Sequence, residues 1–226
     1  MKIATINSIE ISSLCDNACD YCPAPDQGQH RETGLMEHAV FEQAIGWVRK
    51  FAQAGTQREL NLFGVGEPTL HPALVDFVAY AREHLPARQR LHLNTNGNRM
   101  TIELARALKG AGIDSVDITA HKARAAARTL RIFRAAGIAG RISIDPITAP
   151  NNWAGQVDWF APDYFKGAGM ECPWLRRGQV MVMSSGAVTR CCIDAFGRGV
   201  CATLDDDLAA VDLKPFDLCR DCHHIP

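Results

Sequence analysis

The chain has 226 residues, of which 47% are hydrophobic and 22% charged, a length that suits one domain with at most a small appendage. Its 24 basic and 25 acidic residues nearly balance, which argues against a protein that mainly coats nucleic acid but not against a local contact. No apolar run is long enough to span a membrane, and the first residues lack the apolar block of a signal peptide. We therefore expect a cytoplasmic protein with no membrane partner.

Strand-like and helix-like patterns alternate along the first two-thirds of the chain. Strands are predicted at residues 8–13, 59–63, 90–94, 115–119 and 141–145, and helices at about 36–54, 72–85, 101–110 and 123–136. Repeated strand–helix units predict a parallel α/β fold with right-handed crossovers. A closed eight-fold barrel needs ~250 residues. We therefore predict a partial, open barrel of about five parallel strands and four helices.

The pattern changes after residue 148. The following segment is rich in Pro, Gly, Asn and Trp, and two short strands at 179–183 and 187–191 are predicted to form a hairpin. We divide the chain into a barrel at 1–148 and a small C-terminal domain at 149–226.

The predicted strands do not read as the continuous apolar runs of a dry parallel sheet. The third strand alternates Leu91 and Leu93 with His92 and Asn94, and the first strand places Glu10 in the polar set. With a period of two, the apolar set faces the helices and the polar set faces inward. Either a polar cofactor or substrate supplies partners for these groups, or they are strand ends and a buried ion-pair network.

Nine cysteines fall into two groups, with none between residues 23 and 171. In a reducing compartment such cysteines are more often metal ligands or catalysts than disulfides. The first group, Cys15, Cys19 and Cys22, directly follows the first predicted strand. Three thiolates can hold three irons of a [4Fe–4S] cluster and leave the fourth iron open to another ligand. A zinc site is the alternative reading.

The Cys-x3-Cys-x2-Cys spacing, with Tyr21 before the last cysteine, resembles the signature of the radical S-adenosylmethionine (SAM) superfamily. Three further elements follow in the family's order at strand ends, and the resemblance covers about residues 8–146. They are Gly64-Val65-Gly66-Glu67-Pro68, which is similar to the family's Gly-Gly-Glu-Pro with Val65 as a departure, then Asn94-Thr95-Asn96-Gly97, and Asp117-Ile118-Thr119.

The resemblance implies cofactors and a chemistry. The three cysteines would bind a [4Fe–4S] cluster whose open iron chelates SAM, and one electron would then release a 5′-deoxyadenosyl radical that abstracts hydrogen. An electron donor such as flavodoxin or ferredoxin is implied. The residues expected to contact SAM are Tyr21, Gly64, Gly66, Glu67, Asn94, Asn96 and Thr119.

The second cysteine group resembles the twitch domain, the shortened relative of the SPASM domain, which binds one auxiliary [4Fe–4S] cluster. The matching ligands are Cys172, Cys191, Cys219 and Cys222, while Cys192 and Cys201 have no counterpart in the pattern. A structural zinc site is again the alternative.

His121, just after the fourth predicted strand, is a candidate to contact SAM or act as a base, or has a structural role. Arg141 and Asp145, in the fifth predicted strand, are candidates for substrate binding or proton removal, or pair with each other. We predict a radical SAM oxidoreductase that dehydrogenates a polar substrate with help from the auxiliary cluster. The alternatives are a radical isomerase or modifying enzyme acting on a nucleotide, sugar or nucleic-acid base, a SPASM-type peptide maturase, and a two-cluster electron carrier. The maturase is less favoured because no precursor-binding segment precedes residue 8.

Overall fold

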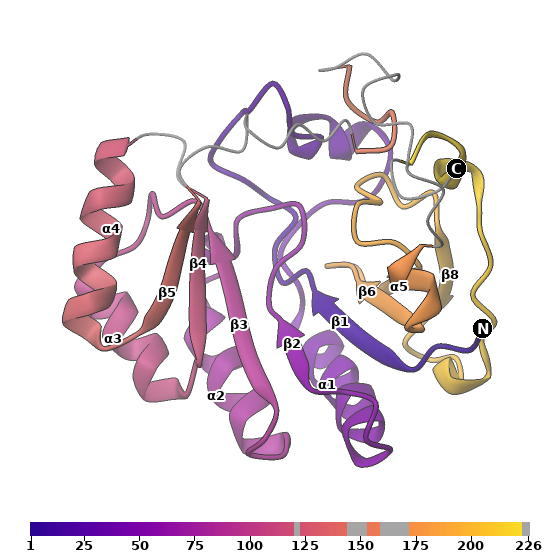
Figure 1. The fold of residues 1–226 in the computed structure, drawn as a ribbon, viewed down its shortest axis with the longest axis horizontal. Coiled ribbons are helices and arrows are strands. Elements are labelled where there is room, and N and C mark those ends of the chain that lie inside the picture. Colours follow the sequence, from indigo (N-terminus) through magenta and orange to yellow (C-terminus); the bar gives the residue numbers. More distant parts are fainter. Residues whose placement is uncertain (120–122, 144–152, 159–171, 223–226) are drawn as a thin grey trace.

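The computed structural model describes residues 1–119, 123–143, 153–158 and 172–222, including their side chains except at 123–126 and 140–143. Strands and helices alternate in its first part, and Figure 1 shows the strands as a fan with the helices along the outer side. In chain order the elements are β1 (Thr5–Ile9), α1 (His38–Gln53), β2 (Glu59–Asn61), α2 (Leu74–His84), β3 (Arg90–Thr95), α3 (Ile102–Ala111), β4 (Ser115–Thr119), α4 (Ala123–Ala136) and β5 (Ala139–Ser143).

The sheet is larger than the five predicted strands. Its order is β5-β4-β3-β2-β1-β6-β7-β8, so it runs from one edge to the other without closing in the described part of the chain. Strand β6 (Gln179–Val182) pairs in parallel with β1, and β7 (Ala187–Thr189) and β8 (Val200–Thr203) follow in antiparallel order. Without β6, strand β1 would expose a row of unpaired backbone groups. Strand β6, drawn in orange, lies directly beside β1 (Figure 1) and pairs with it.

Element boundaries differ from the prediction where pairing reaches beyond the local pattern. Strand β1 begins at Thr5, three residues before the predicted start, because β6 pairs with it from there. Glu10 N still donates to Val182 O of β6 at 2.8 Å, and beyond it the chain bonds to the segment before α1, since Met36 N donates to Ile11 O at 2.9 Å. The fourth strand and fourth helix match their predicted ranges.

Local signals explain the helix positions. Thr101 caps α3 as predicted, because its side chain accepts a hydrogen bond from Leu104 N at 3.1 Å. Gly112 ends the same helix with a φ of 98°, a conformation that favours glycine. Helix α1 buries its predicted apolar stripe, namely Phe41, Ala44, Ile45 and Val48. Within the described residues, no helix has both the length and the apolar character needed to cross a bilayer.

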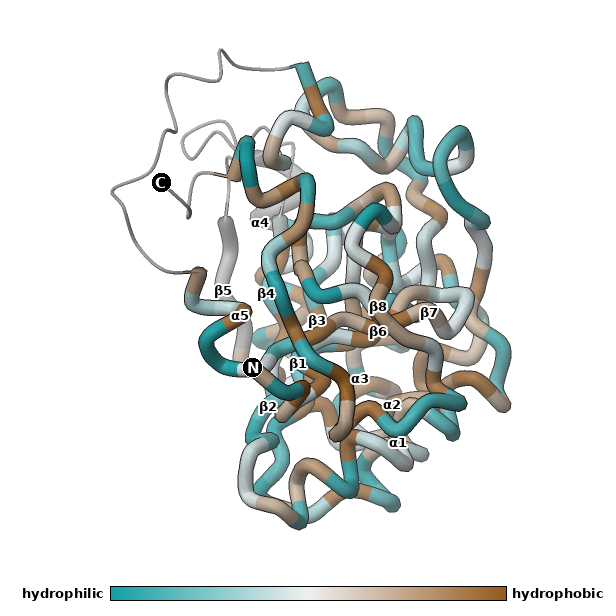
Figure 2. Tube along the Cα trace, turned by 90° about the vertical axis from the view of Figure 1, so that its right-hand side faces the viewer, coloured by the Kyte–Doolittle hydropathy of each residue, from teal (hydrophilic) through white to brown (hydrophobic). Residues whose placement is uncertain are grey.

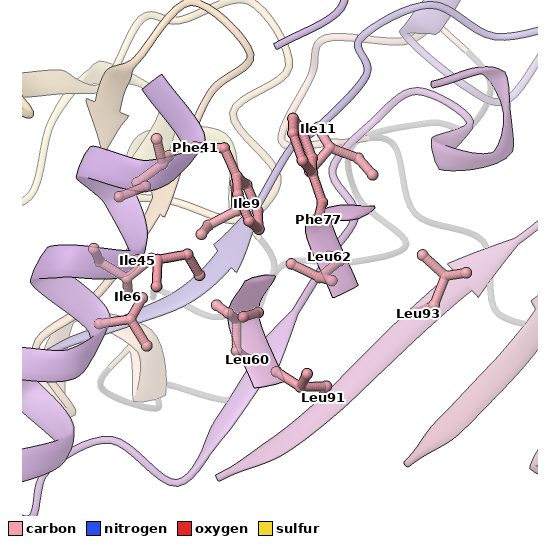
Figure 3. Close-up of a cluster of buried hydrophobic side chains, with 14 of the residues drawn as sticks. Ile6, Ile9, Ile11, Phe41, Ile45, Leu60, Leu62, Phe77, Leu91 and Leu93 are labelled. Carbon is pink, nitrogen blue, oxygen red and sulfur yellow. The ribbon is translucent and has the colours of Figure 1, made fainter. Parts of the chain in front are cut away.

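The hydrophobic core lies between the helices and one face of the sheet. Phe41 of α1 and Phe77 of α2 stack with ring centroids 4.1 Å apart, and Figure 3 shows them over apolar side chains of β1, β2 and β3. In Figure 2 the brown, hydrophobic segments gather along the central strands. Leu91 and Leu93 are fully buried, whereas His92 between them is only half-buried. The predicted alternation is confirmed, and polar side chains are left for the opposite face.

Candidate functional site

The first three cysteines lie on the loop between β1 and a 3-10 helix, η1 (Ala24–Gln29), and all three are half-buried. Cys22 N donates to Cys19 O at 3.0 Å, which gives the loop a tight turn. Burial, together with the charges of the nearby Cys19 and Cys15 thiols, raises the pKa of the Cys22 thiol to about 11. The three sulfurs therefore influence one another electrostatically, as ligands of a common cluster must.

The segment after β3 holds this cysteine loop from one side. Asn96 Nδ2 donates to Asp16 Oδ1 at 2.7 Å, and Asn98 Nδ2 donates to Asn17 Oδ1 at 3.0 Å. Arg99 adds an ion pair with Asp16 at 3.6 Å. The predicted SAM contact Asn96 is thus brought to the cysteine loop. Asp16, Asn98 and Arg99 were not among the predicted site residues, although Asp16 lies within the cysteine motif itself.

The glycines after β2 allow a close approach to the strand that leads into the cysteine loop. A Cβ added to Gly66 would lie 2.7 Å from Leu14 O, and one added to Gly64 would lie 2.7 Å from Glu10 Oε1. Glu67 N donates to Leu14 O at 2.7 Å, which joins the two segments through their backbones. Side chains at these two glycine positions would force the segments apart.

The carboxylate of Glu67 is buried and engaged with protein groups. Its Oε1 accepts hydrogen bonds from Thr69 N at 3.0 Å and from the Thr69 and Thr95 hydroxyls at 2.6 Å each, and its Oε2 accepts one from Asn96 N at 2.7 Å. Burial raises the pKa of Glu67 while these hydrogen bonds lower it. Because its oxygens join the loops after β2 and β3, Glu67 is arranged to position those loops.

Polar side chains of the neighbouring strands β3 and β4 contact one another, and we call this set the polar ladder. Thr119 Oγ1 donates to Asn94 Oδ1 at 3.3 Å, so these two predicted cofactor contacts lie side by side. His92 Nδ1 lies 2.8 Å from Ser115 Oγ, and its Nε2 lies 3.8 Å from Asp117 Oδ2. His92 was expected only as part of the polar lining. Its pairing with Asp117 depends on strand register, which the sequence pattern does not specify.

The structure describes only part of the three predicted catalytic residues. His121 and Asp145 lie outside the described residues. Arg141 lies in β5, where its backbone is in register with Asp117 of β4, and its side chain is outside the described part.

Four C-terminal cysteines surround one pocket with an empty volume of about 290 Å³. They are the four predicted auxiliary ligands, Cys172, Cys191, Cys219 and Cys222. Phe216 N donates to the Cys219 sulfur at 3.4 Å. A side-chain hydrogen bond between Cys191 and Cys192 and burial both raise the pKa of Cys191. Cys192 itself is exposed, and Cys201 donates to Val188 O at 3.5 Å, so neither of these two lines the pocket.

Polar contacts connect the two cysteine groups. Trp153 Nε1 donates to Tyr21 O at 3.0 Å, and the next residue, Ala154, lines the C-terminal pocket. Gln156 Nε2 donates to Ile193 O at 2.7 Å, just after the Cys191–Cys192 pair. Segment 153–158 therefore contacts both cysteine regions.

In the described ranges, no group of three or more His, Cys, Asp or Glu side chains is arranged to hold a single metal ion.

The fold and the cysteine loop together define an open β/α barrel with a three-thiol site after its first strand. The family model described as "Radical SAM superfamily" matches residues 9–144. Because this match covers more than half of the chain, the chain belongs to the radical SAM superfamily. That family implies a [4Fe–4S] cluster and SAM as cofactors.

Two curated relatives match part of the chain. The S-adenosyl-L-methionine-dependent 2-deoxy-scyllo-inosamine dehydrogenase of Niallia circulans is 29% identical over 120 residues, which cover 53% of this chain and 46% of that protein. The tungsten-containing aldehyde ferredoxin oxidoreductase cofactor-modifying protein of Pyrococcus furiosus is 32% identical over 108 residues, or 48% of this chain and 28% of that protein. The matches span less than half the length of either relative.

Two crystal structures share the fold. BtrN in complex with AdoMet and 2-DOIA superimposes with a TM-score of 0.71 and 23% identity, covering 92% of this chain and 84% of that chain. BtrN in an open conformation gives a TM-score of 0.62 and 20% identity, covering 92% and 82%. At these identities the likeness shows the fold alone.

Proposed function

We propose that the chain is a radical SAM oxidoreductase that removes hydrogen from a polar small molecule and holds two [4Fe–4S] clusters. The observation that carries this proposal is the convergence of Cys172, Cys191, Cys219 and Cys222 on one pocket, separate from the three-cysteine loop. A cluster there would resemble that of a twitch domain and would provide a site for an electron taken from substrate. The name of the Niallia circulans relative, a dehydrogenase, supports an oxidation.

The residues around the cysteine loop fit the SAM cluster. Cys15, Cys19 and Cys22 would each bind one iron, and the close packing of Gly64 and Gly66 keeps the segment after β2 beside the cysteine loop, where its backbone would contact a ligand at the fourth iron. Tyr21, Asn94, Asn96 and Thr119 would complete the cofactor site, while Glu67 keeps its loops in place. When bound, the cluster and SAM supply a 5′-deoxyadenosyl group able to abstract a hydrogen atom.

The polar ladder of β3 and β4 fits a substrate with hydroxyl or amino groups. His92, Asn94, Asp117 and Thr119 are half-buried and carry both donors and acceptors. Removing two electrons from a carbon that bears a hydroxyl group requires a hydrogen atom, a proton and an electron to leave. The hydrogen atom would go to the 5′-deoxyadenosyl group, the proton to His121 or Asp145 as the base, and the electron to the auxiliary cluster, while Arg141 would bind the substrate.

The proposal also includes an electron donor and a cellular compartment. A one-electron donor such as flavodoxin or ferredoxin would supply the electron for SAM cleavage. The nine free cysteines fit a reducing compartment, and on that basis we place the protein in the cytoplasm.

Anaerobic reconstitution tests the cofactor content. We expect about eight irons per chain, with about four remaining after Cys15, Cys19 and Cys22 are all changed to Ala. With SAM and dithionite, the wild-type protein should release 5′-deoxyadenosine and the triple variant should not. Protein that holds only zinc and never releases 5′-deoxyadenosine would contradict the proposal.

The reaction class is tested with 2-deoxy-scyllo-inosamine as the first probe, because the relative's name specifies it. We expect an oxidised product with one SAM consumed per turnover. A product isomeric with the substrate would instead indicate a radical isomerase, and tight binding of a peptide with no small-molecule turnover would indicate a maturase.

A further inference from the structure

Arg190 occupies a distinctive position in the C-terminal cysteine pocket. It follows β7 and directly precedes Cys191. Among the described residues that line the pocket, it is the only one with a charged side chain, and the others are the four cysteines and apolar residues. A negatively charged group bound in this pocket would therefore lie next to the positive charge of Arg190.

Backbone carbonyls and an aromatic ring hold the Arg190 side chain. Its Nε donates to Gly199 O at 3.1 Å and its Nη1 donates to Lys214 O at 3.2 Å. Its Cζ lies 5.5 Å from the centroid of the Phe216 ring, which also lines the pocket. Contacts with two segments, one at Gly199 and one at Lys214–Phe216, hold the guanidinium in place.

The fixed guanidinium already acts on sulfur. Burial raises the pKa of the Cys201 thiol, and the charge of Arg190 and its hydrogen bond to that sulfur oppose the rise.

We propose that the positive charge of Arg190 raises the reduction potential of the auxiliary cluster, so that this cluster accepts the electron released by the substrate. The inference rests on the proposed function, which places a [4Fe–4S] cluster on these four cysteines. A cluster with four thiolates carries net negative charge and gains more on reduction. A nearby fixed cation stabilises the reduced form more than the oxidised form, because Coulomb attraction grows with the cluster's charge.

The electron balance follows from the oxidation itself. After hydrogen-atom removal, the substrate radical loses a proton to a base and one electron to the oxidised auxiliary cluster. The reduced cluster then passes that electron to an external one-electron carrier of the flavodoxin or ferredoxin class. Arg190 exchanges no electron and no proton in these steps. It acts on the cluster only through its positive charge.

The test is a redox titration of the reconstituted full-length protein, followed by electron paramagnetic resonance. The auxiliary signal is identified as the one that does not change when SAM is added. We expect Arg190→Gln to shift its midpoint to a lower potential and Arg190→Lys, which keeps the charge, to stay near the wild type. Arg220→Gln is the matched control, since Arg220 lies between two pocket cysteines but its side chain is 83% exposed, so solvent screens its charge and little shift is expected.

Three results would overturn the inference. One is an unchanged midpoint in Arg190→Gln with both clusters present, which leaves the proposed function intact. Another is an equal downward shift in the Gln and Lys variants, which would indicate packing and not charge. If Arg190→Gln does not retain the cluster, the midpoint of Arg190→Lys is compared with that of the wild type. A downward shift in Arg190→Lys would then overturn the inference. The third is an iron count of about four in the wild type, which would remove the auxiliary cluster and with it that part of the proposed function.

Discussion

At the scale of single residues, the structure gives Glu67 a task that its motif does not reveal. The motif places it among the cofactor contacts, whereas its carboxylate joins Thr69, Thr95 and Asn96. A buried carboxylate needs such donors, because an unpaired charge there would cost several kcal/mol. Glu67 therefore joins the loops after β2 and β3 through its carboxylate, and its contact with SAM stays a prediction.

His71 shows how burial determines the charge state of a single side chain. Its Nε2 lies 2.9 Å from Met36 O and its Nδ1 accepts a hydrogen bond from Ala73 N at 3.1 Å, which requires the neutral ring with the proton on Nε2. Burial lowers the pKa of His71. The unfolded chain therefore binds a proton at higher pH than the folded chain does.

The first prediction follows from this pKa difference. Stability from His71 is fully present above the unfolded-state histidine pKa of ~6.5 and is lost progressively as the pH falls below that value toward the lower pKa of the folded state. We expect the wild-type apoprotein to lose more unfolding free energy between pH 7.5 and pH 5.5 than His71→Gln, which does not titrate. Urea denaturation at both pH values measures the difference. Equal losses in the two proteins would refute this account of His71.

At the scale of elements, the cysteine loop is held by its neighbours on several sides. The segment after β2 bonds to Leu14, the segment after β3 bonds to Asp16 and Asn17, and Trp153 bonds to Tyr21. A loop that must hold a cluster in one orientation gains from contacts with rigid elements, because loosely held ligands lose geometry. The glycine at position 66 is required for one of these contacts.

The second prediction compares two glycine substitutions. In Gly66→Ala the new Cβ would lie 2.6 Å from Ser13 C and 2.7 Å from Leu14 O, backbone atoms that can move only if the cysteine loop moves. We expect a loss of about 1–3 kcal/mol in unfolding free energy and a loss of SAM cleavage. Urea denaturation and a 5′-deoxyadenosine assay measure the two effects.

Gly46→Ala is the control for this substitution. Gly46 lies inside α1, and a Cβ there would meet nothing within 4 Å. Alanine should raise the unfolding free energy by about 0.5–1 kcal/mol through the higher helix propensity of Ala, with SAM cleavage unchanged. If both alanine variants behave alike, the close approach at Gly66 is not what matters.

At the scale of the whole molecule, one buried ion pair connects distant segments. Arg31 binds Glu10 through two hydrogen bonds of 2.9 Å each, and their side chains are 8% and 0% exposed. Glu10 also accepts hydrogen bonds from Val65 N and Ser184 N, and Arg31 donates to Ala195 O at 2.6 Å. The pair thus joins β1, the glycine segment after β2 and the C-terminal region. The polar side chains of the strands were also expected to form a buried ion-pair network, and at Glu10 this alternative is confirmed.

The third prediction compares this pair with a surface pair. Arg31→Met leaves the Glu10 carboxylate buried without its cation, and we expect a loss of about 3–5 kcal/mol. Lys2→Met breaks the pair with Asp212, whose side chains are 55% and 54% exposed, and should cost less than about 1 kcal/mol. Urea denaturation of both variants measures the contrast. Similar losses of unfolding free energy in Arg31→Met and Lys2→Met would show that the Glu10–Arg31 pair does not link the segments. A smaller loss in the double variant Glu10→Met/Arg31→Met than in Arg31→Met alone would support the link.

Local patterns in the sequence determined much of this protein. Period-two alternation predicts the polar face of β3 and β4, the Thr101 cap and Gly112 delimit α3, and the spacing of Cys15, Cys19 and Cys22 indicates the family. These features depend on residues a few positions apart, where backbone geometry alone relates side chains. They therefore survive without knowledge of the fold.

Tertiary structure alone decided which distant segments meet. It placed β6 beside β1, paired Glu10 with Arg31, brought Asn96 to Asp16, and put Arg190 in the pocket of the C-terminal cysteines. No periodicity relates such residues, since their contacts arise from how β-strands and loops pack after the chain has folded. The sequence names the chemical groups, and packing selects the partners that give each group its charge state and role.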